Sequence, residues 1–264
     1  MLSCEVVDRY HDEVGIEWSS DVGQAAWWVD VLHPFARDVG SIVPDSFAAY
    51  ARVFHPAGSK RWSEIAAHTG RVVHPEMQFD RIATALDGTR WTPDEPPMDG
   101  TLDADGLTRL AALLARHTST PQQCWFAIWD GYGQLHGGEA TAVTTWTREP
   151  GSDHETVVRS RAEPLLAPPT LNGPRIDAPS REYFLASGAL DDLSDFHAQV
   201  GRQSPNVWWP ADRSWIVATE IDFCWTYVAG DRAAIDDVLR NRDFEALESQ
   251  TNHGITFNSD IINL

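Results

Sequence analysis

The chain has 264 residues, with 39 acidic and 20 basic side chains and a formal net charge of −19 at pH 7. This charge argues against direct binding to nucleic acid, because phosphate groups would be repelled. No apolar run reaches the roughly 18–20 residues of a membrane helix, and the acidic first residues do not resemble a secretory signal, so we expect a cytoplasmic protein without membrane contact.

The first third of the sequence predicts short helices. Residues 24–32 are compact and apolar, and residues 61–69 end at Gly70. Between them, residues 45–54 have Phe47, Tyr50, Ala51 and Phe54 at helical spacing, which predicts another helix. Residues 87–105 form a loop rich in proline and acidic residues. A helix with leucines at helical spacing follows as far as His117.

The middle of the chain predicts strands. Residues 124–130 indicate a buried strand, and the β-forming residues 141–147 are expected to be its hairpin partner. Residues 148–180 contain six prolines and predict a connector with one short strand at 156–161. If the chain contains two subdomains instead of one domain over 1–264, this connector is their boundary.

The last third gives the clearest pattern. We predict strands at 181–186, 214–221 and 223–228, then an amphipathic helix that Asp231 caps, and a final edge strand at 251–258. Together the elements predict an α+β fold. It has a mostly antiparallel sheet with helices packed on it and a helix-rich N-terminal part.

Signatures of common catalytic classes are missing from the sequence. It has no phosphate-binding loop, no HExxH and no nucleophile elbow. Cys4, Cys124 and Cys224 are far apart and odd in number, which argues against a disulfide framework or a zinc knuckle. We therefore expect no cofactor and no metal. A metal site built from the proline-flanked His33, His55 and His74 with Asp130 or Glu76 is an alternative, although such histidines more often mark helix ends.

Residues 203–227 are the candidate binding segment, because they combine tryptophans with charged residues. Since Pro205 and Pro210 indicate a loop, adjacent tryptophans cannot both point inward, and one is expected to be exposed. In the alternative interpretation both cover the edge of the core, and Asp212 and Arg213 form a salt bridge in a turn. The predicted partner- or ligand-binding residues are Trp208, Trp209, Asp212, Arg213, Glu220 and Asp222.

Two groups of acidic residues could contact a partner. Glu220 and Asp222 lie two apart on a predicted strand and would share one face. A third carboxylate such as Asp130 would be needed to make a cation or acid–base site, and the alternative is a solvated face. The loop at 94–105 carries five acidic residues and no base, so it is either a docking surface for a basic partner or merely solvated.

Three segments resemble a family of acidic, tryptophan-rich proteins from GC-rich, actinobacterial-type bacteria. They are YARVFHPA (50–57), CWFAIWDGYG (124–133) and SPNVWWPADRSWIVATEID (204–222). This resemblance implies no activity and no catalytic residue. PDSFAAY (44–50) is similar to the proline–aromatic helix start of SUKH-type immunity proteins, although HPAG (55–58) stands where their glycine-rich turn would follow.

Two functions lead from the sequence, and a structural or scaffold role, which the sequence does not separate from the first, is a third. The first is a non-enzymatic protein-binding role, immunity- or adaptor-like, in which an acidic, Trp-bearing face holds a basic protein. The second is an enzyme of unrecognised class whose cleft contains Asp130, Glu220 and Asp222 with His55 or His74. The enzyme requires these side chains to converge in one pocket. The oligomeric state is open.

Overall fold

The computed structural model describes the backbone of residues 15–149 and 152–264 and, within these ranges, the side chains outside residues 139–161. The N-terminal segment in which we expect no secretory signal lies almost wholly outside the described residues, as does Cys4. In the described part of the chain, no helix is long and apolar enough to cross a membrane.

The body of the molecule is built around one antiparallel sheet, so the predicted α+β class is confirmed. In the described part of the chain it has nine strands, which come from both sides of the proline-rich segment 148–180 and, in the case of β6 (Ile176–Ala178), from within it. Across the sheet lie β1 (Glu17–Ser19), β7 (Arg181–Gly188), β3 (Cys124–Trp129), β8 (Val207–Pro210), β9 (Trp215–Ala218), β10 (Trp225–Gly230), β2 (Ala49–Phe54) and β11 (Glu245–Ser249), and β6 pairs with the start of β7.

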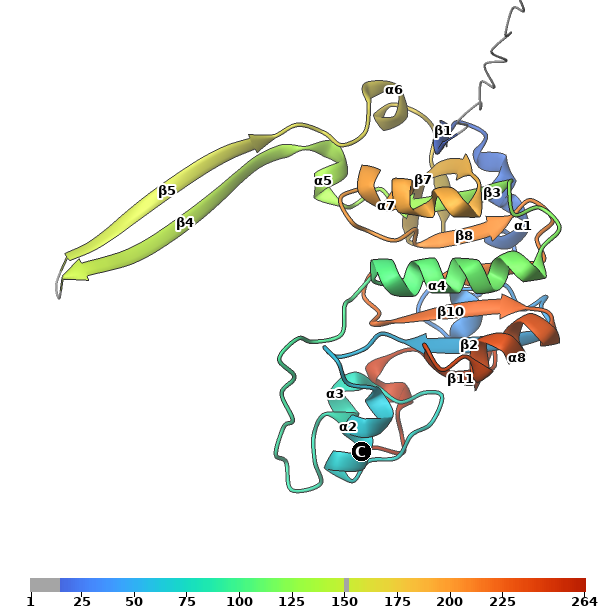
Figure 1. The fold of residues 1–264 in the computed structure, drawn as a ribbon, viewed down its shortest axis with the longest axis horizontal. Coiled ribbons are helices and arrows are strands. Elements are labelled where there is room, and N and C mark those ends of the chain that lie inside the picture. The colour runs from blue at the N-terminus through green and yellow to red at the C-terminus, as the bar shows by residue number, and fades with distance from the viewer. Residues whose placement is uncertain (1–14, 150–151) are drawn as a thin grey trace, which may run out of the picture.

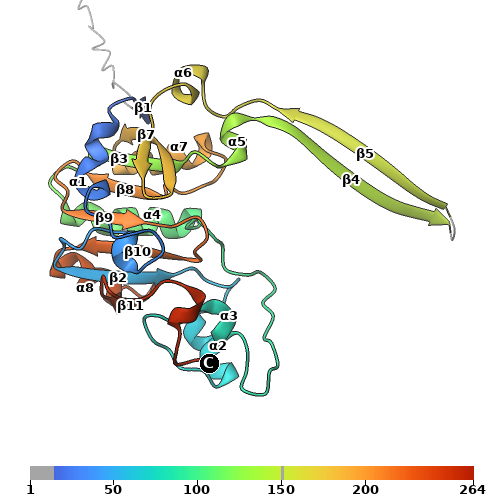
Figure 2. The same cartoon turned by 180° about the vertical axis from the view of Figure 1, so that it is seen from behind.

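Helices contribute to a core on each face of this sheet. One face packs against α4 (Ala104–Leu114), α7 (Leu193–Gln199) and α8 (Arg232–Arg240), which lie in front of the sheet in Figure 1. The core of the other face includes side chains from α1 (Ala26–Val29), α2 (Trp62–Thr69) and α3 (Phe79–Ile82), and Figure 2 shows α1 on this side. Because both faces are covered, the central strands are buried throughout and mostly apolar instead of alternating, with Arg52 and Thr226 as buried polar exceptions.

The helix predicted at 45–54 is wrong, because the second half of this range is the strand β2. All six residues of β2 are buried between β10 and β11. A strand that is buried on both faces has no polar side to reveal its period, so apolar residues at helical spacing arise there by chance. Among the described residues 15–60, the helical structure consequently consists of short turns, namely α1 and two 3-10 helices at Val22–Ala25 and Val39–Ser41.

The hairpin predicted between 124–130 and 141–147 is also wrong. β3 forms as expected but pairs with β7 and β8. Residues 141–147 belong to β4 (Gly138–Glu149), which pairs with β5 (Ser152–Ala162) in a separate two-stranded ribbon. The predicted connector thus holds β5, which includes the short strand expected there, as well as α6 (Pro168–Leu171) and β6. The short helix α5 (Gly133–His136) precedes the ribbon.

Helix ends were predicted well because their signals are local. α2 ends at Gly70, whose φ of +73° favours glycine. Asp103 accepts a hydrogen bond from Gly106 N and caps α4, and Asp231 does the same for α8 through Ala234 N. The final edge strand, by contrast, is β11 and not residues 251–258, which form turns and enter a 3-10 helix at Phe257–Ser259.

Candidate cation-binding groove

The two adjacent tryptophans of the predicted site are both buried. Trp208 and Trp209 are each 1% exposed and lie on the strand β8, so the predicted loop and the exposed tryptophan are wrong, whereas the alternative in which both tryptophans cover the core is confirmed. Successive side chains of a strand point to opposite faces, and here each face has its own core. Trp208 packs edge-on against Trp215 on one side, and Trp209 packs against Trp28 on the other.

Asp212 is exposed, but its carboxylate is fully engaged within the chain. It accepts hydrogen bonds from Ser119 N at 2.7 Å, Ser119 Oγ at 2.8 Å, Thr118 Oγ1 at 2.9 Å and Ser214 N at 3.1 Å. Partial burial alone would raise the pKa of Asp212, but the hydrogen bonds from Ser119 and Ser214 outweigh it and lower the pKa to about 2. Asp212 therefore fastens the β8–β9 turn to the segment before β3.

Glu220 and Asp222 lie at the opposite end of β9 from Asp212 and Arg213, so the predicted site is not one surface. Both occupy the β9–β10 turn, not a strand as predicted, and both contact Arg181. Glu220 Oε1 is 2.6 Å from Arg181 Nη2, and Asp222 Oδ2 is 3.2 Å away. The Glu220 side chain is 6% exposed and neutralised by this contact, whereas that of Asp222 is 75% exposed.

Asp222 stands at the rim of a groove of about 460 Å³. The other acidic residues of the groove are Asp80, from α3, and Asp99, from the loop at 94–105 that the sequence indicates as a docking surface. Its aromatic lining comes from Phe79, Phe223, Trp225 and Phe257. The groove thus combines acidic and aromatic side chains from four segments that are far apart in the sequence.

A close backbone approach holds Asp99 next to Asp222. Gly100 N donates a 2.9 Å hydrogen bond to the carbonyl oxygen of Phe223. Gly100 has φ +70°, and a Cβ atom there would lie only 2.6 Å from the Ile221 carbonyl oxygen. Only glycine combines this conformation with this proximity, so Gly100 positions the acidic loop against the β9–β10 turn.

The three carboxylates of the groove differ in their partners. Asp80 pairs with Arg90, and Asp222 pairs with Arg181. Asp99 has no hydrogen-bond or ion-pair partner among the described residues. Partial burial, followed by the negative charges of Asp222 and Asp80, raises the pKa of Asp99. The groove therefore has a carboxylate whose ionised form a bound cation would stabilise.

The aromatic lining is partly open. The ring of Trp225 is covered on one face by the Arg52 guanidinium, 3.8 Å from its centroid, and stacks with Phe223 at 4.3 Å. Phe79 and Phe223 are partly exposed and Phe257 is 52% exposed, so these rings provide the accessible apolar surface. Aromatic faces beside carboxylates are suited to a cationic group with an aliphatic stem, such as the side chain of arginine or lysine.

Cys224 also lines the groove, and its chemistry is that of an inert thiol. Burial, assisted by the charge of Asp99, raises the pKa of Cys224 to about 12. The thiolate, which is the form that attacks substrates and binds metals, is therefore scarce at neutral pH. The groove is equipped for binding and not for nucleophilic attack by this cysteine.

The residues of the alternative enzyme cleft do not converge. Asp130 contacts Arg175 Nε at 3.1 Å, near the start of the ribbon. His55 is buried, bonded to the carbonyl oxygen of Met98 at 2.6 Å and to Thr226 Oγ1 at 2.9 Å, and burial lowers its pKa to about 4. Asp130 shares a pocket with Arg181, the partner of Glu220 and Asp222, but neither these two acids nor His55 or His74 lines that pocket, so the structure does not bring the five side chains into one cleft.

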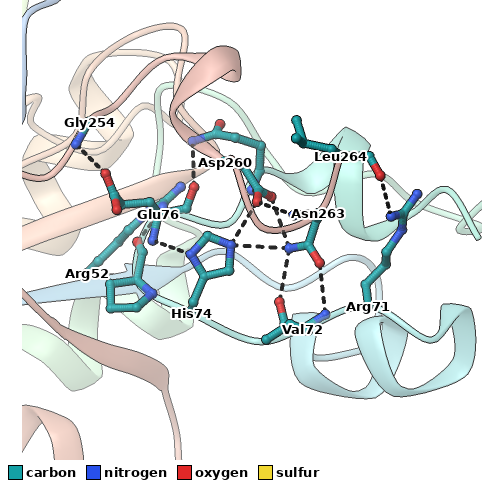
Figure 3. A network of polar contacts seen from close by, with 11 residues as sticks. Arg52, Arg71, Val72, His74, Glu76, Gly254, Asp260, Asn263 and Leu264 are labelled. Carbon is teal, nitrogen blue, oxygen red and sulfur yellow. Dashed lines mark hydrogen bonds and ion pairs between the residues drawn. The ribbon is translucent and has the colours of Figure 1, made fainter. Parts of the chain in front are cut away.

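His74 belongs to a structural network around residues 254–264 (Figure 3). Its Nε2 is 2.8 Å from Asp260 Oδ1, and its Nδ1 accepts a hydrogen bond from Glu76 N. Asn263 bonds both to Asp260 and to the backbone of Val72. In the described part of the chain, no group of three or more His, Cys, Asp or Glu side chains is arranged to hold a metal ion.

Searches of protein-family models, curated proteins and solved structures found no match to this chain. The resemblances to the tryptophan-rich family and to SUKH-type proteins therefore stay predictions. The function has to be inferred from the geometry of the groove.

Proposed function

We propose that the protein is a non-enzymatic binding protein whose groove holds a basic segment of a partner protein. The observation that carries this proposal is Asp99, an exposed carboxylate that has a raised pKa and no described partner and that shares a groove with aromatic side chains. An arginine or lysine side chain would lay its aliphatic stem against Phe223 and bring its charge to Asp99 and Asp222.

The overall charge supports the same partner chemistry. A net charge of −19 attracts basic proteins over several ångströms and accelerates their encounter, while salt weakens this attraction. The pKa of Asp99 is raised first by desolvation and then by the charges of Asp222 and Asp80, and a cation bound at Asp99 would offset this repulsion. We therefore expect binding to become stronger as the pH rises through this raised pKa, because only the ionised carboxylate attracts the cation.

We propose that this binding serves an immunity- or adaptor-like role in the cytoplasm. Proteins of this kind act by occupying a surface of their partner, and they need no catalytic group. An acidic face that receives a basic segment suits a partner that itself binds nucleic acid, because such proteins have basic surfaces.

The test uses a hexa-arginine peptide as the basic probe and isothermal titration calorimetry at 50 and 300 mM NaCl. Asp99→Asn and Asp222→Asn should each weaken binding by roughly fivefold to tenfold at the lower salt concentration, because each removes one charge at the groove. Asp191→Asn is the matched control, since Asp191 is an exposed acid beside α7 and outside the groove. Equal affinities for the wild type and both groove variants would exclude the groove as the binding site.

A further inference from the structure

A two-stranded ribbon projects from the body of the molecule (Figures 1 and 2). It consists of β4 and β5, which pair antiparallel with each other and with no other described strand. At about 3.3 Å per residue, the 11 residues of β5 extend over roughly 35 Å. The ribbon is thus an arm whose two long edges are not paired with the sheet of the body.

An isolated ribbon of this kind calls for a further strand. Two-stranded hairpins are marginally stable in water, because they cannot enclose a core. Each outer edge also presents a row of backbone N–H and C=O groups that another strand can pair with. A strand added to one edge satisfies these groups and makes a wider, more stable sheet.

The charge of the arm differs from that of the rest of the chain. Residues 138–162 include four acidic and three basic residues, so the arm is almost neutral in a chain of net charge −19. Two copies that meet through their arms would hold their acidic bodies apart by more than the Debye length of about 8 Å at physiological salt. The arm is therefore a region where charge repulsion opposes the approach of a second copy only weakly.

The sequence of β5, SDHETVVRSRA, is symmetrical in its charges about Val157. Asp153 and Arg161 lie four positions before and after Val157, and Glu155 and Arg159 lie two positions before and after it. When two identical strands pair antiparallel about a two-fold axis centred on one residue, positions equally far before and after that residue stand opposite each other. Each acidic position of β5 then stands opposite a basic position of the other copy.

We infer that β5 pairs antiparallel with β5 of a second copy, centred on Val157, and joins two arms into a four-stranded sheet. The register sets Asp153 opposite Arg161 of the second copy and Glu155 opposite Arg159 of the second copy. The two-fold axis repeats both pairs, which gives four cross-strand pairs of opposite charge, each of them stabilising. This inference is independent of the groove and of its proposed partner.

The other strand of the arm does not offer this match. In β4, Glu139 and Arg148 lie nine positions apart. A two-fold axis centred on one residue pairs positions that lie equally far on either side of it, and these positions are always an even number apart. No two-fold register of β4 can therefore place Glu139 opposite Arg148. Within one arm, Glu155 stands opposite Thr145 and Arg159 opposite Thr141, so these two charges have no opposite charge at their register positions in the same copy.

A charge-swap series followed by sedimentation velocity at 50 mM NaCl tests the pairing. The wild type should dimerise reversibly, whereas Glu155→Arg and Arg159→Glu should each raise the dimer dissociation constant by roughly tenfold or more, since both place like charges opposite each other. The double variant Glu155→Arg/Arg159→Glu should dimerise like the wild type. A mixture of the two single variants should form heterodimers, because every charge pair between them is then opposite.

Two further variants distinguish pairing through β5 from a general effect of charge and from pairing through β4. Arg148→Glu makes the same change of charge on β4 and should leave the dimer intact. Val157→Cys should give an intermolecular disulfide under mild oxidation, whereas Val143→Cys, which pairs with position 157 inside the ribbon, should not. A wild type that stays monomeric at 200 µM and low salt, or single variants that do not associate when mixed, would overturn the inference, and the free edges of the arm would then be assigned to a foreign strand.

Discussion

The two ends of β9 show how differently one residue type can behave on the same sheet. At one end, Asp212 receives hydrogen bonds from neighbouring backbone and side-chain groups, and its pKa is lowered to about 2. At the other end, Asp99 has no described partner and lies near two other carboxylates, and its pKa is raised. A carboxylate that the fold satisfies contributes to stability, whereas one that the fold leaves unsatisfied is available to a ligand.

The largest expected effect comes from removing Arg181, whose guanidinium pairs with the buried Glu220 and with Asp222 of the groove. Arg181→Met leaves Glu220 buried without its partner, and we expect a loss of about 3 kcal/mol in the free energy of unfolding, measured by urea denaturation. The double variant Arg181→Met/Glu220→Gln should recover part of this loss, because the unpaired charge is gone. An unchanged stability in the single variant would mean that Glu220 takes up water or a proton at little cost.

A smaller loss of stability is expected at the other end of β9, at Asp212. Asp212→Asn should destabilise the protein by about 1 kcal/mol at pH 7, a value reduced from the pKa shift because this side chain is exposed. The folded-state pKa lies below the unfolded value, so this stability is present above pH 4 and is lost as the pH falls towards 2. Urea unfolding of both proteins between pH 7 and pH 2 should therefore show the difference disappearing on acidification.

The smallest effect has the opposite sign and sharpens the comparison. Asp99→Asn should leave the stability unchanged or raise it by up to about 0.5 kcal/mol at pH 7, because it removes a carboxylate that its neighbours repel. The folded-state pKa of Asp99 lies above its unfolded value. The free energy of unfolding of the wild type therefore falls, relative to that of the variant, as the pH rises from the unfolded to the folded pKa. A clear destabilisation by Asp99→Asn at pH 7, again measured by urea unfolding, would show that Asp99 has a structural role like that of Asp212.

The candidate site was only partly predictable from the sequence. The loop at 94–105 was indicated as an acidic docking surface, and Asp222 as a binding residue, and both contribute to the groove. Nothing in the sequence linked them to Asp80 or Phe257, because the link depends on how the loop packs at Gly100. The adjacent tryptophans were misjudged for the same reason, since two faces can be buried only if helices cover both sides of the sheet.

Sequence signals that act over a few residues determined the fold class, one buried strand and several helix ends. The α+β class, the buried strand β3 and the ends of the capped helices follow from residues that are close in the sequence, as with Gly70, Asp103 and Asp231. Strand pairing, the burial of β2 and the separation of Asp212 from Asp222 were decided by the tertiary structure. The reason is physical: capping and turn preferences act over a few residues, whereas the burial and the partners of a side chain depend on segments that only folding brings together.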